Sequence, residues 1–143
     1  MCLYCGVPIL PNTDDSLLLR TAFADKAAWI GAMSAATSPD EDGFRAYVRV
    51  VDDKGWDGVG WEDLREAVAS TTSQASVLFV VDDIALDPPY PILVVDLVED
   101  RAPFRCIASE LGSVENNLNI ANMDWEDFTG CTDANGVFNG FVD

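Results

Sequence analysis

The chain has 143 residues, of which 25 are acidic and 8 basic, and its formal net charge at neutral pH is −17. Such a surface repels phosphate backbones and anionic lipids, so we expect neither nucleic-acid nor membrane binding, whereas cationic partners and metal ions are attracted. The sequence contains no histidine, which excludes Ser-His-Asp triads, Cys-His pairs and imidazole metal ligands.

Length and hydrophobic content predict one folded domain. Hydrophobic residues make up 49% of the chain, more than disordered acidic proteins contain. Residues 1–15 end in the turn-rich segment PNTDD and predict an irregular leader, followed by a single domain over 16–143. The opening segment MCLYCGVPIL lacks the basic region of a signal peptide, and no apolar run reaches the roughly 20 residues of a membrane span. We therefore expect a cytoplasmic protein.

The first half of the chain alternates strands and helices. An apolar run at 17–19 predicts a central strand. Asp25 is suited to cap a helix that has apolar residues at helical spacing and ends near Ala36. Residues 46–51 predict a second strand. The glycine-rich segment KGWDGVG connects it to a second helix, whose apolar face includes Trp61.

The second half adds three strands and a helical end. The continuous apolar run 77–81 predicts a strand buried on both faces. The following loop, ALDPPYP, is too short for a crossover helix, so 92–97 should return antiparallel, and 104–107 gives the last strand. Helical spacing at 111–121 and a short helix capped by Asp124 complete the chain. The order β-α-β-α-β-β-β predicts an α/β domain with a mixed sheet of about five strands, helices packed on it and a C-terminal helical segment.

Pairs of aspartates follow the second and third predicted strands. If these strands are parallel neighbours, Asp52-Asp53 and Asp82-Asp83 share the carboxyl edge of the sheet, where ligands of open α/β sheets bind. Carboxylates gathered there suit a cationic partner, a cationic substrate, Mg²⁺ or Ca²⁺. The alternative is that these residues simply form turns, which favour aspartate.

A tryptophan in a loop and an asparagine-rich helix supply further candidate binding residues. Trp56 lies in the glycine-rich loop and is predicted to be an exposed apolar anchor. Asn116, Asn119 and Asn122 belong to an Asn-rich helix, although Asn is a poor helix former. These amides either form a polar recognition surface or bond to loop backbone and hold the C-terminal segment in place.

The cysteines offer an alternative metal site. Cys2 and Cys5 have the C-x-x-C spacing of zinc ligands, but Cys106 and Cys131 are far apart in sequence. The competing interpretation is incidental thiols in the leader and a small core residue at Cys106. We predict no cofactor, with zinc or a divalent cation as the alternative.

Several segments together resemble a known family. They are LPNTDDSLLLRTAFADKAAW, DGFRAYVRVVDD, PILVVDLVED, SVENNLNIANMDWEDF and DANGVFNGF. The pattern is similar to that of small actinobacterial proteins classified as a domain of unknown function (family 6924), and it runs from about Leu10 to Phe141. The leader MCLYCGV is not part of it. The resemblance implies a single domain over nearly the whole chain and implies nothing about activity.

Two functional hypotheses follow. The first is a non-catalytic module that recognises a basic protein partner through acidic residues, as immunity-type, anti-toxin and some regulatory proteins do. The second is a small-molecule or divalent-cation binding protein, or a small enzyme of specialised metabolism, with an Asp-lined site at the same edge. The sequence leaves the oligomeric state open. The candidate binding residues are Asp52, Asp53, Asp82, Asp83, Trp56, Asn116, Asn119 and Asn122.

Overall fold

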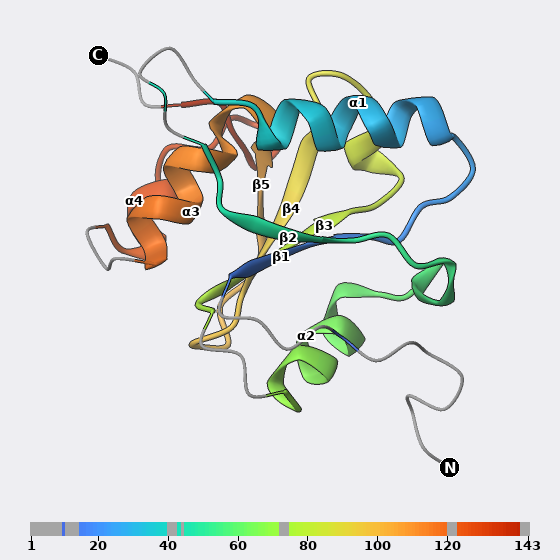
Figure 1. Ribbon diagram of the computed structural model, residues 1–143. Coiled ribbons are helices and arrows are strands. Elements are labelled where there is room, and N and C mark those ends of the chain that lie inside the picture. The colour runs from blue at the N-terminus through green and yellow to red at the C-terminus, as the bar shows by residue number, and fades with distance from the viewer. Residues whose placement is uncertain are drawn as a thin grey trace.

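A computed structural model describes residues 10, 15–39, 43, 45–71, 75–119 and 123–140. Within these residues a six-stranded mixed sheet carries helices on both faces, with α1 on one side and α2 on the other (Figure 1). The predicted α/β architecture is therefore confirmed, as a three-layer arrangement. No helix in the described part of the chain is long and apolar enough to cross a membrane.

The regular elements follow the predicted order. They are β1 (Ser16–Arg20), α1 (Lys26–Thr37), β2 (Val48–Val51), α2 (Trp61–Ala69), β3 (Val77–Val81), β4 (Pro91–Asp96), β5 (Phe104–Ile107), α3 (Leu111–Asn119), α4 (Trp125–Thr129) and β6 (Val137–Phe138). Three short 3₁₀ helices lie in the connections: η1 (Lys54–Trp56), η2 (Ile84–Leu86) and η3 (Ala108–Glu110).

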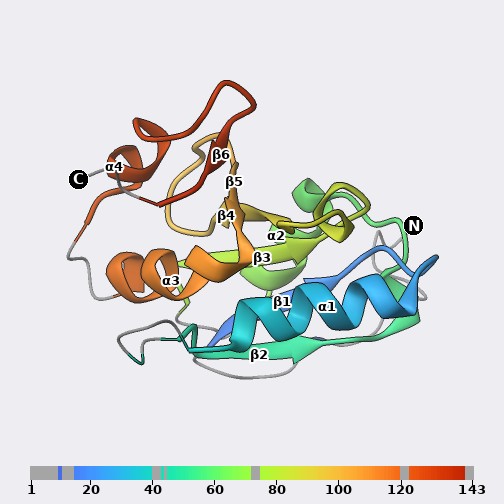
Figure 2. The same ribbon diagram turned by 90° about the horizontal axis from the view of Figure 1, so that it is seen from above.

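The strand order across the sheet is β2-β1-β3-β4-β5-β6, which Figure 2 shows from above. β1 is parallel to both β2 and β3, so these three strands point the same way. β4 returns antiparallel beside β3, as its short connection predicted, and β5 is antiparallel to β4. The sixth strand, β6, was not predicted as a strand because it has only two residues; it pairs with β5.

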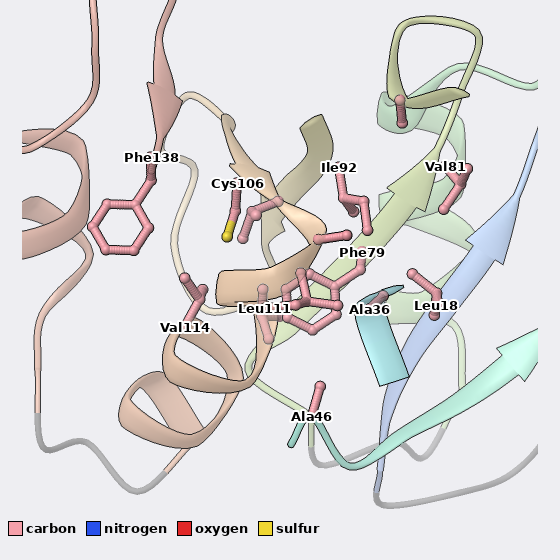
Figure 3. Packing of buried hydrophobic residues seen from close by; sticks show 14 of the residues in the cluster. Leu18, Ala36, Ala46, Phe79, Val81, Ile92, Cys106, Leu111, Val114 and Phe138 are labelled. Atoms are coloured by element: carbon pink, nitrogen blue, oxygen red, sulfur yellow. The ribbon is translucent and has the colours of Figure 1, made fainter. Parts of the chain in front are cut away.

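α1 covers one face of the sheet together with α3 and α4. The helix begins where predicted, because the Asp25 carboxylate accepts a hydrogen bond from the Ala28 N–H at 3.0 Å. Its buried side chains Trp29, Ala32 and Ala36 join a core that also contains Phe79 of β3. Figure 3 shows this core, in which side chains from β1, β3, β4 and α3 meet.

α2 covers the opposite face over a second core, which includes Leu64 of the helix itself. Successive residues of a strand point to opposite faces, so Leu78 and Val80 of β3 enter this second core while Phe79 enters the first. All five residues of β3 are buried. The continuous apolar run in the sequence thus correctly predicted a strand covered on both sides.

Candidate functional site

The aspartate pairs lie at one edge of the sheet but do not form a cluster. Because β2 and β3 are both parallel to β1, Asp52-Asp53 and Asp82-Asp83 follow the same, carboxyl edge, as predicted. The prediction that the two strands are neighbours was wrong: β1 lies between them, and two strand spacings amount to about 10 Å. Among the described residues, no group of three or more Cys, Asp or Glu side chains is placed to hold a metal ion.

A buried arginine forms an ion pair with the first aspartate of the first pair, Asp52. Arg20, at the end of β1, is only 5% exposed, and its Nη1 donates to the Asp52 carboxylate at 3.1 Å. Its Nε donates to the Ala22 carbonyl at 3.0 Å, and its guanidinium lies 4.2 Å from the centre of the Phe23 ring. The centre of the Trp29 ring of α1 lies 5.3 Å from the same guanidinium, which places this ion pair on the α1 face. Asp52 is therefore committed to an internal ion pair.

A second arginine binds Asp82. Arg105 of β5 reaches across β4 and makes a bidentate contact with the Asp82 carboxylate, at 2.7 and 2.9 Å. The same guanidinium donates to the Pro91 carbonyl at 3.0 Å, and the Asp82 carboxylate also accepts from the Ala85 N–H at 3.2 Å. Asp82 thus anchors the β3–β4 connection to β5.

The second aspartate of each pair makes no ion pair with a residue that the structure describes. Asp53 caps η1 by accepting from the Gly55 N–H at 3.0 Å and otherwise faces solvent. Asp83 makes no side-chain hydrogen bond to any residue that the structure describes, and it is exposed. Of the four predicted carboxylates, Asp53 and Asp83 make no ion pair with a described residue, whereas Asp52 is exposed but paired with Arg20.

The prediction that Trp56 is exposed was wrong. Its side chain is 1% exposed and lies in the core beneath α2, with Leu64 and Leu19 in the same cluster. Two residues later, Gly58 takes a φ of +75°, a conformation that favours glycine, and its N–H bonds to the Thr21 carbonyl at 2.9 Å. This turn folds the loop back over the sheet, so an apolar side chain at position 56 enters the core.

The Asn-rich helix uses its described amides to hold structure. The Asn116 amide donates to the Arg45 carbonyl at 3.2 Å and to the Gly112 carbonyl at 2.8 Å, and Asn117 donates to the Ser113 carbonyl at 2.8 Å. These bonds agree with the interpretation that the amides pair with backbone. The side chain of Asn119 and the whole of Asn122 lie outside the described residues.

The cysteines do not come together in the described structure. Cys106 is buried in the core, where burial raises the pKa of its thiol and keeps it protonated. Cys131 is exposed and lies on the turn after α4. Cys2 and Cys5, the candidate zinc ligands, are outside the described residues.

A cleft of about 210 Å³ lies at the carboxyl edge, between the ends of β1 and β3. Thr21 lines it after β1, residues 58–61 line it from the β2–α2 loop and the first turn of α2, and Asp82-Asp83 line it after β3. α1 connects β1 to β2 on one side of β1, and α2 then connects β2 to β3 on the opposite side of β1. The space between the ends of β1 and β3 is therefore a topological switch point, the place where α/β sheets bind ligands.

Sequence reasoning identified the edge but missed most of the cleft residues. The arginines that bind Asp52 and Asp82 could have been found from the sequence. Arg20 ends an apolar strand and Arg105 interrupts one, and an arginine buried in this way requires a carboxylate partner. The roles of Thr21 and Trp61 depend on the order of the strands, which brings distant loops together.

Comparison with known proteins assigns the chain to a family but indicates no activity or ligand for it. No protein with a curated description matches the sequence. A family described as a domain of unknown function (DUF6924) matches residues 15–141, which include every strand and helix described above. The match agrees with the resemblance seen in the sequence, and the chain belongs to the DUF6924 family.

Proposed function

We propose that the protein is a non-catalytic binding module that recognises a basic protein partner through the carboxyl edge of its sheet. The observation that carries this proposal is a surplus of carboxylates in the three connections at that edge and the adjoining helix turns. Nine acidic side chains lie there, and we call them the acidic rim: Asp25, Asp52, Asp53, Asp57, Glu62, Asp63, Asp82, Asp83 and Asp87.

The rim remains negative after its internal ion pairs are counted. Arg20 and Arg105 pair with Asp52 and Asp82, and the lysines at this edge are Lys26 and Lys54. Nine carboxylates against these four cations leave a local excess of five negative charges. Carboxylates that lie within a Debye length of one another, about 8 Å at physiological salt, add their potentials and steer a cationic surface toward this edge.

Rigid placement supports recognition over mere solubility. The carboxylates of Asp25 and Asp53 are oriented by the backbone N–H groups that they cap, and Asp82 is fixed by Arg105. A partner that meets fixed charges loses less side-chain freedom on binding than one that meets mobile charges. The edge therefore presents a preformed negative surface.

The test compares two triple variants with equal charge change. The rim variant is Asp57→Asn/Asp83→Asn/Asp87→Asn, which removes three exposed rim carboxylates without a described side-chain hydrogen bond. Capture of proteins from the source cells by wild type should return a protein of high isoelectric point, and the association should weaken strongly as salt is raised. The rim variant should associate with that protein about ten times more slowly.

The control variant is Glu99→Gln/Asp100→Asn/Glu126→Gln, at the opposite end of the strands. These side chains are 65, 92 and 68% exposed and pair with surface arginines, so their loss should cost little stability. The control should bind the captured partner as wild type does. Salt-independent binding, capture of acidic proteins alone, or equal slowing by both variants would contradict the proposal.

The second hypothesis, a small-molecule site at the same edge, is favoured by a separate observation, the cleft between β1 and β3. It does not depend on a protein partner.

A further inference from the structure

One cleft residue, Thr21, offers a hydroxyl to a ligand. Thr21 is 6% exposed and lines the cleft, and its hydroxyl makes no hydrogen bond to any residue in the described part of the chain. Its N–H bonds to the Val81 carbonyl, so it continues β1 by one residue and shares the α2 face with Leu19. Val80 and Leu93, on the same face, also line the cleft, which places the Thr21 side chain toward it.

The first turn of α2 adds hydrogen-bond donors next to this hydroxyl. Gly60 is the N-cap and lines the cleft with Trp61, and no side chain caps the helix. The first intrahelical bond is from the Leu64 N–H to the Gly60 carbonyl, which leaves the N–H groups before Leu64 without an intrahelical acceptor. Apart from Gly60 and its two chain neighbours, no described atom would lie within 4 Å of a β-carbon at this position, so a ligand has room to approach.

The other side of the cleft supplies acceptors. Asp83 is exposed at the end of β3, and Asp82 lies beside it, already bound to Arg105. The cleft therefore has two chemically different sides: donors from Thr21 and the α2 N-terminus, and carboxylate from Asp83. Val80, Leu93 and the ring of Trp61 supply an apolar lining between them.

We propose that this cleft binds a small zwitterion of the amino-acid type, with its carboxylate at the Thr21 hydroxyl and the first turn of α2 and its ammonium at Asp83. The cleft volume of about 210 Å³ is below the range of pockets that hold drug-sized ligands, which suits a ligand of this size. This proposal rests on the second hypothesis above, a small-molecule site in this cleft, and does not depend on the protein-partner function.

Charge separates the zwitterion from its alternatives. A phosphate or nucleotide would gain the α2 N-terminus but carries no positive group to meet Asp83 across the cleft, in a chain of net charge −17. A simple cation would be attracted to Asp83 but repelled by the positive end of the α2 dipole and unable to accept from its N–H groups. A zwitterion has no net charge, and it can accept hydrogen bonds from Thr21 and the α2 N-terminus while its ammonium pairs with Asp83.

The test is calorimetric titration and thermal denaturation of the full chain with the common free L-amino acids, each at millimolar concentration. At least one should bind saturably and raise the melting temperature. Its N-acetyl derivative lacks the ammonium and its primary amide lacks the carboxylate, and both should bind about tenfold more weakly or not at all. Inorganic phosphate should not bind.

Two variants locate the site. Thr21→Val keeps the side-chain shape and removes the hydroxyl, and Asp83→Asn removes the acceptor charge at an exposed position where folding is not at risk. Each should raise the dissociation constant about tenfold. The matched controls are Thr37→Val, whose hydroxyl donates to the Met33 carbonyl on α1, and Asp87→Asn. Neither control should change the affinity.

Each contrary result overturns the proposal in a distinct way. Absence of binding by every amino acid removes the site. An amide that binds as tightly as its parent shows a cation site, and an acetylated form that does so shows an anion site. Unchanged affinity in Thr21→Val and Asp83→Asn places the ligand elsewhere. The basic partner should still bind Thr21→Val normally, so the two proposals can fail separately.

Discussion

The ion pair between Asp82 and Arg105 is the contact by which the β3–β4 connection is attached to β5. Its two hydrogen bonds measure 2.7 and 2.9 Å, and the Arg105 side chain also donates to the Pro91 carbonyl. We consider Asp82→Asn, which keeps the size of the side chain, and Arg105→Met, which keeps its apolar stem. Each variant removes one charge and leaves the other partly buried.

The coupling energy between these side chains should be about 1–2 kcal/mol. Fully exposed pairs contribute about 0.2–1 kcal/mol, and breaking a fully buried pair costs about 3–5 kcal/mol. The side chains here are 17% exposed for Arg105 and 29% exposed for Asp82, between those cases. Because the contact is bidentate, we expect a coupling energy near the upper value, about 2 kcal/mol.

The assay is urea unfolding of wild type, both single variants and the double variant, from which the coupling free energy is obtained as a double-mutant cycle. The control cycle uses Arg65 and Asp100, whose single ion contact is 3.1 Å and whose carboxylate is 92% exposed. Its coupling should stay below about 0.5 kcal/mol. A coupling for Asp82–Arg105 no larger than that of the control would refute the argument that partial burial and bidentate geometry strengthen this pair.

Three further outcomes are expected. Trp56→Ala should lower the free energy of unfolding by about 3–5 kcal/mol in urea, because the ring is 1% exposed; a loss under about 1 kcal/mol would indicate the exposed anchor predicted from sequence. Gly112→Ala should lower the free energy of unfolding by about 1–3 kcal/mol, because the new β-carbon would lie 3.0 Å from the carbonyl carbon of Arg45. This exchange usually stabilises a helix, so a more stable variant would show that α3 can move away from Arg45. The backbone N–H of Val137 holds the pKa of the Asp133 carboxyl below its ordinary value of 3.8, so this carboxylate stabilises the fold above that pH and the benefit disappears as pH falls through the lower folded pKa. The stability difference between wild type and Asp133→Asn should therefore narrow as pH falls from about 5 to about 2, and a constant difference would exclude this role.

Local sequence signals determined the elements of this protein. The periodicity after Asp25 predicted α1, and the carboxylate of Asp25 does cap it. The unbroken apolar run 77–81 predicted a strand buried on both faces, and the short loop after it required β4 to be antiparallel. These features depend on spacing within a few residues of one another, which a sequence displays directly. Among the described elements, the two-residue β6 and the three short 3₁₀ helices were not predicted.

Tertiary structure decided which side chains meet at the candidate site. The sequence predicted that Asp52 and Asp82 share an edge, but only the strand order places β1 and Arg20 between them. Arg105 reaches Asp82 from a strand 23 residues later. Trp56 is buried because the loop turns back at Gly58. Side chains from distant segments meet through strand order and loop direction, and a linear pattern of residue types does not contain that information.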